Sequence, residues 1–502
     1  MATLSVAAIL AENARRRPHK TALVEGGLRL SFGEVWQRSL ARAGALAGLG
    51  VRPGDRVALM APNTAEFPVA YYAITAAGGV VVPVHLLLSP REVTHVLKDS
   101  GAGLLLVHPA QAETGRAAAD ALGIRVVVLG EELDRLADAA VPLSSYLTRE
   151  ADDPAVIFYT SGTTGEPKGA VLSHFNIVMN ATVNAFDAND IRPDDIALGA
   201  LPLFHAFGQT VSLNSTWRAG ATLVLLPRFD AARAIELMVQ EGVNTLHGVP
   251  TMFVALAAAA EHAAALPDLR VCVSGGASLP VAVLERFEAA FGAKIYEGYG
   301  LSETSPTATV NQPVFGTRAG TIGHPLWGID VEIARADTEG SVELLPAGEL
   351  GEVVVRGHNV FSGYLGRPEA TAEALVDGWF RTGDLGVKDE DGFLSIVDRK
   401  KDIIIRGGYN VYPREIEEIL MRHPGVAQVA VIGLPDDLHG EEVCAVVVPE
   451  PGSGPDAAGI TEWSKEHLGK YKYPRRVEFT DALPLGPSMK VLKRELRARY
   501  TA

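Results

Sequence analysis

Short apolar runs alternate with amphipathic segments along the first 150 residues of this chain. Segments such as residues 66–77 and 90–99 repeat their apolar positions at helical spacing. Short apolar runs bounded by polar residues predict buried strands, and strands that alternate with helices predict a doubly wound, largely parallel sheet. The predicted strands are residues 57–60, 79–84, 104–107 and 126–129.

The pattern changes at about residue 320. From there to residue 397, short strand-like runs are separated by turns rich in glycine and proline, which predict a small antiparallel barrel or distorted sheet. A charged stretch at 398–402 interrupts the strands, and a new alternation of strand and helix follows. We expect an α/β protein with a large N-terminal domain of doubly wound mixed sheets plus a small β-barrel, residues 1–397, and an α+β C-terminal cap domain, residues 398–502.

Length and charge narrow the possible classes. A chain of 502 residues exceeds what one hydrophobic core usually supports, and a net charge of −15 argues against a nucleic acid partner. The N-terminal apolar patch precedes its basic cluster, the reverse of a signal peptide, and no uncharged apolar stretch of about 18 residues occurs. We expect no integral membrane segment, a cytoplasmic location, and buried thiols at Cys272 and Cys444, which lie far apart in apolar runs.

The segment YTSGTTGEPKG, residues 159–169, follows the apolar run 155–158 and precedes a segment expected to be an amphipathic helix. Its glycines expose backbone N–H donors, and its hydroxyls and Lys168 add further groups that bind anions. It is not a Walker loop, because Glu166 and Pro167 separate Gly165 from Lys168. The segment predicts a phosphate site, with a flexible linker as the alternative.

Three further motifs follow predicted strands. LGALPLFHAFG carries His205 among aromatic residues, VCVSGG ends in a glycine pair, and YEGYGLSETSP contains Tyr299 and Glu303. In a parallel sheet, ligands collect where loops leave the carboxyl ends of the strands. We expect these motifs and the phosphate loop to occupy that position in one such sheet and to face one crevice. Taken alone, a histidine beside aromatic residues is more typical of a packed core than of a functional site.

Two of these motifs contain groups suited to a nucleotide. Tyr299 lies between glycines that leave room for a purine, and Glu303 lies among hydroxyls that suit Mg²⁺, although a tight turn with an exposed glutamate has the same composition. Asp384 follows a glycine in the predicted turn RTGD, and a carboxylate there is able to accept both ribose hydroxyls. The RTGD turn by itself is weak support for a nucleotide site.

These motifs, in this order, resemble those of the adenylate-forming superfamily of acyl-CoA synthetases, peptide-synthetase adenylation domains and firefly-type luciferases. The resemblance extends from the first strands to Lys490 and implies ATP, Mg²⁺ and CoA as ligands. It implies catalytic roles for Lys490, His205, Glu303 and Thr160, with Mg²⁺ held by Glu303 and Thr160. The implied ATP-binding residues are Thr160, Ser161, Gly162, Thr163, Thr164, Gly165, Lys168, Gly275, Gly276, Ala277, Glu297, Gly298, Tyr299, Gly300, Ser302, Asp384, Ile396, Arg399 and Lys490.

The resemblance also implies a mobile C-terminal cap. Asp398 matches the hinge of the family, and the cap rotates between the two halves of the reaction. Lys490 matches the lysine of the pattern Pro-x-x-x-Ser-Gly-Lys, but position 489 is methionine instead of glycine. A methionine at a position that needs a positive φ would be strained and would displace the lysine. The implied CoA-binding residues are Lys401, Arg406, Gly407, Gly408 and Tyr409.

The acid substrate is predicted from the residues that match the acyl pocket. No acidic residue lies between Leu201 and Trp217, which argues against an amino acid substrate because its ammonium group would be buried without a partner. No arginine of the kind found in malonate-activating relatives occurs at residues 246–253. The predicted pocket residues, mostly apolar, are Phe204, His205, Phe207, His247, Val249, Met252, Ser274, Gly300 and Ala308.

We therefore expect an ATP-dependent acyl-CoA ligase for a medium- or long-chain fatty acid or another bulky apolar acid. An aryl or terpenoid acid is the alternative, and a carrier-protein thiol could replace CoA as acceptor. A luciferase-like oxygenase, and a protein that has lost its chemistry, are two further possibilities. The expected oligomeric state is a monomer or a homodimer.

Overall fold

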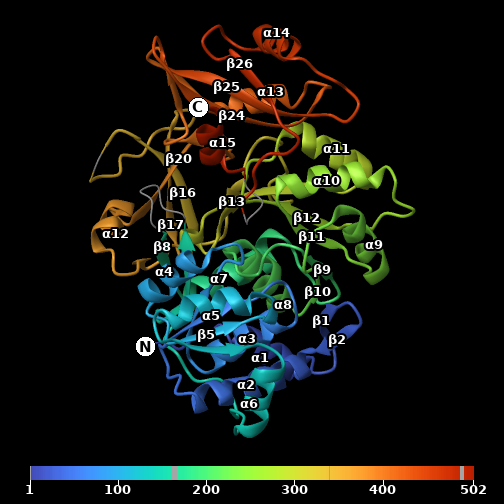
Figure 1. Ribbon diagram of the computed structural model, residues 1–502, viewed down its shortest axis with the longest axis vertical. Coiled ribbons are helices and arrows are strands. Elements are labelled where there is room, and N and C mark those ends of the chain that lie inside the picture. Colours follow the sequence, from blue (N-terminus) through green and yellow to red (C-terminus); the bar gives the residue numbers. More distant parts are fainter. Residues whose placement is uncertain (1, 161–166, 339, 487–490, 502) are drawn as a thin grey trace.

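The computed structural model describes residues 2–160, 167–338, 340–486 and 491–501. In Figure 1 the N-terminal part forms the lower body of the molecule, and the segment after residue 400 forms a cap at the top. Within the described residues no helix is long and apolar enough to cross a membrane. Both cysteines are buried and free, as predicted.

The first large sheet has the strand order β18-β8-β7-β4-β3-β5-β6. Strands β7, β4, β3, β5 and β6 are parallel neighbours, whereas β7–β8 and β8–β18 are antiparallel pairs. The predicted strands of the first 150 residues all belong to it. Its bounds are β3 Arg56–Met60, β4 Val80–Pro83, β5 Leu104–Val107, β6 Arg125–Val128, β7 Pro154–Thr160, β8 Lys168–Ser173 and β18 Gly363–Tyr364.

The second large sheet has the strand order β15-β14-β13-β12-β11-β9-β10-β1-β2. Its central strands from β13 to β1 are parallel, and antiparallel strands close both edges. The bounds are β1 Thr21–Glu25, β2 Leu28–Ser31, β9 Ile196–Gly199, β10 Thr222–Leu225, β11 Thr245–Gly248, β12 Val271–Ser274, β13 Ile295–Gly300, β14 Thr307–Val310 and β15 His324–Pro325.

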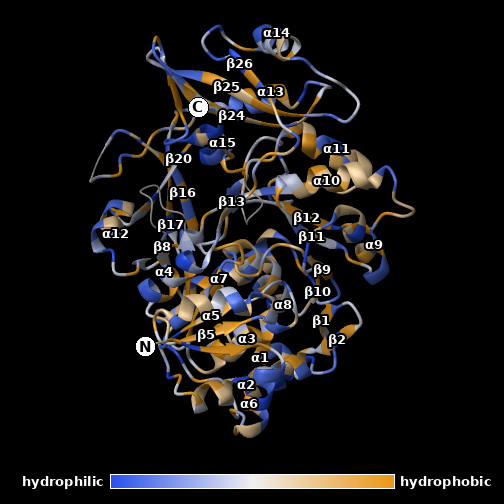
Figure 2. Cartoon of the chain, in the orientation of Figure 1, coloured by the Kyte–Doolittle hydropathy of each residue, from blue (hydrophilic) through white to orange (hydrophobic). Residues whose placement is uncertain are grey.

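Helices form three layers around these two sheets. One core joins α2, α3, α7 and α8 between the sheets, a second packs α9, α10 and α11 on the outer face of the second sheet, and a third packs α4 and α5 on the first. Figure 2 shows hydrophobic residues along the strands of both sheets. These helices are α2 Phe32–Gly48, α3 Glu66–Ala76, α4 Pro90–Ser100, α5 Ala112–Asp120, α7 His174–Val183, α8 Thr216–Ala219, α9 Ala231–Glu241, α10 Pro250–Ala260 and α11 Val281–Phe291.

Local sequence sets many helix ends. Ser31 and Ser89 cap α2 and α4 in reciprocal capping boxes with glutamates three residues later. Asp230 caps α9, which ends at Gly242 in the left-handed conformation. The remaining short helices are α1 Ala8–Arg16, η1 Pro109–Gln111, α6 Glu131–Ala139, η2 Asn184–Ala188, η3 Phe207–Ser215, η4 Ser302–Thr304 and α12 Pro368–Ala374.

The segment after residue 320 forms an antiparallel half-barrel sheet, as the turn-rich sequence predicted. Strand β20 pairs with β17, β19 and β21, and β17 also pairs with β16. The bounds are β16 Ile329–Ala334, β17 Gly351–Gly357, β19 Leu375–Val376, β20 Trp379–Lys388 and β21 Leu394–Arg399.

The cap has its own sheet, of order β23-β22-β25-β24 with β26 parallel to β25. Helices pack on both of its faces, giving two separate clusters of buried residues. The bounds are β22 Ile404–Arg406, β23 Tyr409–Val411, α13 Pro413–Leu420, β24 Val426–Asp436, β25 Gly440–Pro449, α14 Ala457–His467, β26 Arg476–Phe479 and α15 Lys493–Tyr500.

Three local predictions were wrong. Residues 170–173 are part of strand β8, so the phosphate loop joins two antiparallel strands and the helix starts only at His174. Asp384 lies inside strand β20 instead of closing a turn. The four motifs do not follow strands of a single sheet, because β7 belongs to the first sheet while β9, β12 and β13 belong to the second.

Candidate active site

Glu303 lies where three separate parts of the chain meet. Its Oε1 accepts hydrogen bonds from the Thr160 hydroxyl at 3.5 Å and from the Tyr364 hydroxyl at 3.0 Å. Thr160 ends β7 and Tyr364 ends β18, so these contacts tie η4 to the first sheet. Burial raises the pKa of the Glu303 carboxyl, and the hydrogen bonds from Tyr364 and Thr160 oppose that effect. A buried carboxylate beside a hydroxyl offers the oxygen ligands that Mg²⁺ prefers.

The turn around Glu303 is tightly constrained. The N–H of Leu301 donates to the Thr304 hydroxyl at 2.9 Å, and the Ser305 hydroxyl donates to the carbonyl of Asn359 at 2.7 Å. A Cβ at Gly300 would lie 1.9 Å from the carbonyl oxygen of Pro306, so only glycine fits there. These contacts fix the direction in which the Glu303 side chain leaves the turn.

Asp384 connects the half-barrel sheet to the tyrosine of the YEGYG motif. One carboxylate oxygen accepts from the Tyr299 hydroxyl at 2.7 Å, and the other lies 2.9 Å from Nε of Arg399. Asp384 itself is buried, and its N–H donates to the Thr382 hydroxyl at 3.1 Å. Three of the predicted nucleotide-binding side chains therefore form one hydrogen-bonded group.

Lys168 begins strand β8 and is opposite Thr160 in the β7–β8 pair. Its Nζ lies 5.3 Å from the centre of the Tyr364 ring, close enough for a cation–π contact. The positive charge is thus next to the group that surrounds Glu303. The predicted phosphate ligands Ser161, Gly162, Thr163, Thr164 and Gly165, and the predicted catalytic Lys490, lie outside the described residues.

Most of the remaining predicted ATP-binding residues lie in or directly after the neighbouring strands β12 and β13. Gly275 and Gly276 come directly after β12, and a Cβ at Gly275 would lie 3.2 Å from the Phe207 ring. Gly298 lies in β13, and Ile396 lies in β21 beside the Asp384–Arg399 pair. Two other predicted residues, Ala277 and Ser302, are exposed and half-buried respectively.

The predicted acyl pocket is only partly assembled. His205, Phe207, Val249 and Gly276 line one small cavity, together with Leu201, Pro202 and Gly208. The Phe204 ring packs edge-on against His85 at 4.6 Å. The other predicted members are buried in different places: Met252 in the α9–α11 core, Ala308 in the core between the sheets, and Ser274 at the end of β12.

Glu297 is the buried acid of the YEGYG motif. Its Oε1 accepts from the N–H of Leu279 at 3.0 Å. Burial raises the pKa of the Glu297 carboxyl to about 7. The positive charge of Arg414 lowers this pKa, and the negative charge of Glu418 raises it further. Arg414 and Glu418 belong to α13 of the cap, and Glu418 accepts from the N–H of Val281 at 3.3 Å. The carboxylate thus lies close to the contact between the large domain and the cap.

This raised pKa predicts a pH-dependent stability. The folded protein binds the Glu297 proton more tightly than the unfolded chain does. This proton therefore contributes to the free energy of unfolding in full below pH 4.5, and the contribution is lost as pH rises through 7. Relative to a Glu297→Gln variant, the wild type should lose about 3 kcal/mol of unfolding free energy between pH 4.5 and pH 8. Denaturant unfolding at several pH values measures this difference.

The matched control is Glu285→Gln, on the exposed face of α11. The difference between Glu285→Gln and wild type should stay constant over the same pH range. A constant difference between Glu297→Gln and wild type would show that the Glu297 carboxyl has the same pKa in the folded and unfolded states.

The predicted hinge residue Asp398 lies at the end of β21. Its carboxylate accepts from the N–H of Arg399 at 2.8 Å and from the N–H of Arg414 at 3.1 Å. The guanidinium of Arg414 in turn donates to the carbonyl of Ile396. Around it, Lys493 pairs with Glu417 at 2.7 Å and Arg497 with Asp402 at 3.4 Å. The Arg414–Ile396 hydrogen bond thus joins the predicted cap to the large domain, while the two ion pairs lie within the cap.

The predicted CoA-binding residues lie on the first hairpin of the cap. Gly407 and Gly408 both have positive φ, 57° and 82°, and form the turn between β22 and β23. Arg406 makes a bidentate pair with Glu442 at 2.7 and 2.8 Å, and the exposed Tyr409 packs on Tyr471. Burial lowers the pKa of the fifth residue, Lys401.

Sequence reasoning missed Tyr364 and Arg414. Tyr364 contacts Glu303 although it lies 61 residues further along the chain. The sequence does hold a sign of it, since Tyr364 follows Gly363 and precedes Leu365-Gly366, much as Tyr299 lies between glycines. Arg414 carries no local sign, because its partners Asp398 and Glu297 are reached only through the packing of the cap.

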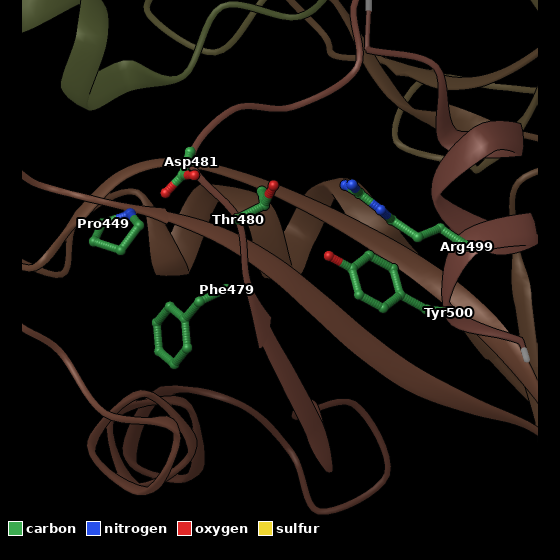
Figure 3. Close-up of a pocket in the computed structure, with 6 residues that line it drawn as sticks. All are labelled: Pro449, Phe479, Thr480, Asp481, Arg499 and Tyr500. Carbon is green, nitrogen blue, oxygen red and sulfur yellow. The ribbon is translucent and has the colours of Figure 1, made fainter.

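A surface hollow of about 330 Å³ lies on the cap, between β26 and α15. It contains none of the predicted site residues, and Figure 3 shows Arg499 and Tyr500 entering it from the helix. Asp436, His439 and Glu442 also cluster on the cap, but the Glu442 carboxylate is already paired with Arg406. Neither feature is close to the group around Glu303. The hollow is lined by Pro449, Phe479, Thr480, Asp481, Arg499 and Tyr500.

Two protein families match most of the chain. A family described as AMP-binding enzyme matches residues 10–365, and one described as AMP-binding enzyme C-terminal domain matches residues 415–490. Among solved structures, ATP-bound MatB from Rhodopseudomonas palustris has a TM-score of 0.91 and 35% sequence identity, over 99% of both chains. The first match contains the group around Glu303, and the second begins within α13, one residue after Arg414.

Two curated proteins are similar over almost their full length. A feruloyl-CoA synthase from Amycolatopsis sp is 42% identical over 489 residues, 97% of each chain. A long-chain-fatty-acid–CoA ligase from Bacillus subtilis (strain 168) is 35% identical over 530 residues, 98% of this chain and 94% of the other. These two proteins act on acids of different shape, so the comparisons leave the choice of acid open.

Proposed function

The chain belongs to the family of AMP-binding, adenylate-forming enzymes and is an acid–thiol ligase of the acyl-CoA synthetase type, and we propose that it activates an aromatic carboxylic acid for transfer to CoA. The group formed by Glu303, Thr160, Tyr364 and Lys168, beside the Asp384–Tyr299 pair, is the observation that supports this reaction most directly. It combines a place for a metal-bound phosphate with a place for a nucleoside.

The proposed reaction has two halves. A carboxylate oxygen attacks the α-phosphorus of ATP, and the bond to the leaving pyrophosphate breaks, which gives an acyl-adenylate. The sulfur of a thiolate then attacks the acyl carbon, and the carbon–oxygen bond to AMP breaks to give a thioester. A carboxylate is a poor electrophile and AMP is a good leaving group, so adenylation has to come first.

The side chains around the site have distinct tasks in this proposal. Asp384 accepts the ribose hydroxyls, and Tyr299, which is hydrogen-bonded to Asp384, packs against the adenine. Glu303 and Thr160 would hold Mg²⁺, which supplies positive charge to the triphosphate. Lys490 neutralises charge that develops at the α-phosphate, an electrostatic effect that is often the largest catalytic term.

We further propose that the cap is residues 398–502 and turns about Asp398. The Glu418–Val281 hydrogen bond and the Arg414–Ile396 hydrogen bond join the cap to the large domain in its present position. Turning would exchange Lys490 for the hairpin that carries Gly407, Gly408 and Tyr409, which would bind CoA together with Lys401 and Arg406. Such a step keeps water away from the adenylate between the two halves.

The aromatic assignment is supported by the higher identity to the feruloyl-CoA synthase, 42% against 35% for the fatty-acid ligase. A fatty acid is the second candidate, because the lining is apolar and the fatty-acid ligase is similar over nearly its whole length.

Mass spectrometry of product mixtures tests this function. The enzyme is incubated with ATP and Mg²⁺ and with matched aromatic and fatty acids, each with and without CoA. We expect an acyl-adenylate from the aromatic acids without CoA and the acyl-CoA when it is present. Adenylate that persists with CoA would indicate another thiol acceptor, and products from fatty acids alone would overturn the aromatic assignment.

A further inference from the structure

His247 lies at the middle of the second sheet and is completely buried. Neither of its ring nitrogens has a hydrogen-bond partner among the described residues. Burial lowers the pKa of the ring to about 4, so the imidazole is neutral near pH 7 and offers one donor and one acceptor. A buried polar group without a hydrogen-bond partner costs free energy. A buried histidine with both nitrogens unpaired is therefore rare unless a ligand supplies the missing hydrogen bonds.

The strand pattern shows which way His247 points. Leu246 packs in the α9–α11 core, and a Cβ at Gly248 would lie 3.0 Å from the Phe253 ring of α10. Because side chains alternate along a strand, His247 points to the opposite face, into the helical layer between the two sheets. Its neighbour in β12, Val273, belongs to the core of that layer.

The helix η3 lies in this same layer, beside β9 and β11. It is a π-helix, Phe207–Ser215, and π-helical segments are uncommon and often occur at functional sites. Its first two residues, Phe207 and Gly208, line the small acyl cavity. Two segments that line the cavity also lie near the buried imidazole. One is the start of η3, which contacts β11, and the other is Val249, two residues after His247.

The same helix carries further polar atoms without partners. The Gln209 side-chain oxygen and the hydroxyls of Thr210 and Ser212 are buried and have no hydrogen-bond partner among the described residues. Buried side chains of these types are normally satisfied. The helical layer next to the apolar cavity thus contains further buried polar groups besides His247.

We propose that His247 is a specificity-determining residue that hydrogen-bonds a hydroxyl group on the acid, at the end remote from its carboxylate. The inference rests on the proposed function, since it assigns a polar subsite to the acyl pocket of that enzyme. The hydroxyl forms a hydrogen bond with the imidazole ring, whose nitrogens have no other partner among the described residues. For the acid to reach His247, η3 has to move so that the cavity extends to the imidazole. An acid without this hydroxyl leaves His247 unsatisfied, and this penalty is the source of the selectivity.

A matched pair of acids tests the proposal. The specificity constant kcat/KM for adenylate formation is measured with 4-hydroxycinnamic acid and cinnamic acid, which differ by one hydroxyl. We expect wild type to favour the hydroxylated acid by at least about tenfold, and His247→Leu to reduce this ratio to near one. His247→Gln, which keeps a donor and an acceptor, should retain part of the preference.

The control variant is Thr245→Val, on the same face of β11, also fully buried and two residues away. It should keep the wild-type ratio. Equal use of the two acids by wild type, or an unchanged ratio in folded His247→Leu and His247→Gln, would overturn the role of His247 while leaving the aromatic ligase intact. If neither acid is adenylated, the aromatic assignment fails and the proposal fails with it.

Discussion

Replacing Glu303 with glutamine should lower the rate of adenylate formation by about 10²- to 10³-fold, the loss typical of removing one key electrostatic group. The amide has nearly the shape of the carboxylate and can still contact Thr160 and Tyr364, so the fold should be retained. What is lost is the negative charge that would hold Mg²⁺ beside the triphosphate. Because Glu303 is buried, water cannot take the place of its carboxylate beside the metal.

The rate is measured as ATP–pyrophosphate exchange with a saturating acid, over a range of Mg²⁺ concentrations. The variant should need more Mg²⁺ to reach its reduced maximum. Two controls separate metal binding from local structure: Tyr364→Phe removes one hydrogen bond to Glu303, and Glu236→Gln alters an exposed pair on α9. Tyr364→Phe should cost less than Glu303→Gln, and Glu236→Gln should have no effect.

An exchange rate within about threefold of wild type for Glu303→Gln would contradict the metal-binding role. It would leave Glu303 as a purely structural residue that ties η4 to β7 and β18. A lower thermal stability with a normal rate would support that structural reading.

Replacing Asp384 with asparagine should raise the KM for ATP by about 10- to 100-fold, since each hydrogen bond to a charged group is worth about 1.5–3 kcal/mol. Asp384 already accepts from Tyr299 and lies against Arg399, so its carboxylate is oriented before ATP arrives. An asparagine keeps one acceptor oxygen and places a donor where the second stood. The ribose then loses an acceptor, and the Arg399 charge loses its partner.

A comparison of ATP with 2′,3′-dideoxy-ATP isolates the ribose contact. Wild type should prefer ATP strongly, whereas Asp384→Asn should discriminate much less, because the group that reads the hydroxyls is gone. The control is Asp389→Asn, on the rim of the same half-barrel sheet, where Asp389 pairs with Arg318. Equal discrimination by wild type and Asp384→Asn would show that Asp384 orients Tyr299 and Arg399 without touching the ribose.

Both predictions concern residues that the sequence marked without showing how they meet. Glu303 and Asp384 stood out because each lies beside glycines and hydroxyls. The contacts that give them their roles come from Thr160, Tyr364, Tyr299 and Arg399, which are between 15 and 143 residues away in the chain from the residue they contact. Such contacts depend on how two sheets and a half-barrel pack, which no local pattern contains.

The family resemblance was confirmed by matches over residues 10–365 and 415–490. It accounts for the ligase chemistry, whereas the acid is still a proposal. The fatty-acid prediction relied on apolar residues in the pocket, and these residues suit an aromatic ring equally well. Hydropathy reports how much water a surface excludes but carries little information on the shape of the space enclosed.

The sequence by itself determined the strands, most helices and the order of the motifs, because apolar runs and caps act over a few residues. Tertiary structure decided where those motifs meet. It made residues 170–173 a strand, since pairing with β7 buries Ala170 and Leu172. It also left His247 without a hydrogen-bond partner among the residues that the structure describes, and brought Arg414 of the cap to Asp398 and Glu297. Local preferences are set along the chain, but the partners of buried charged and polar groups are set by packing between distant segments.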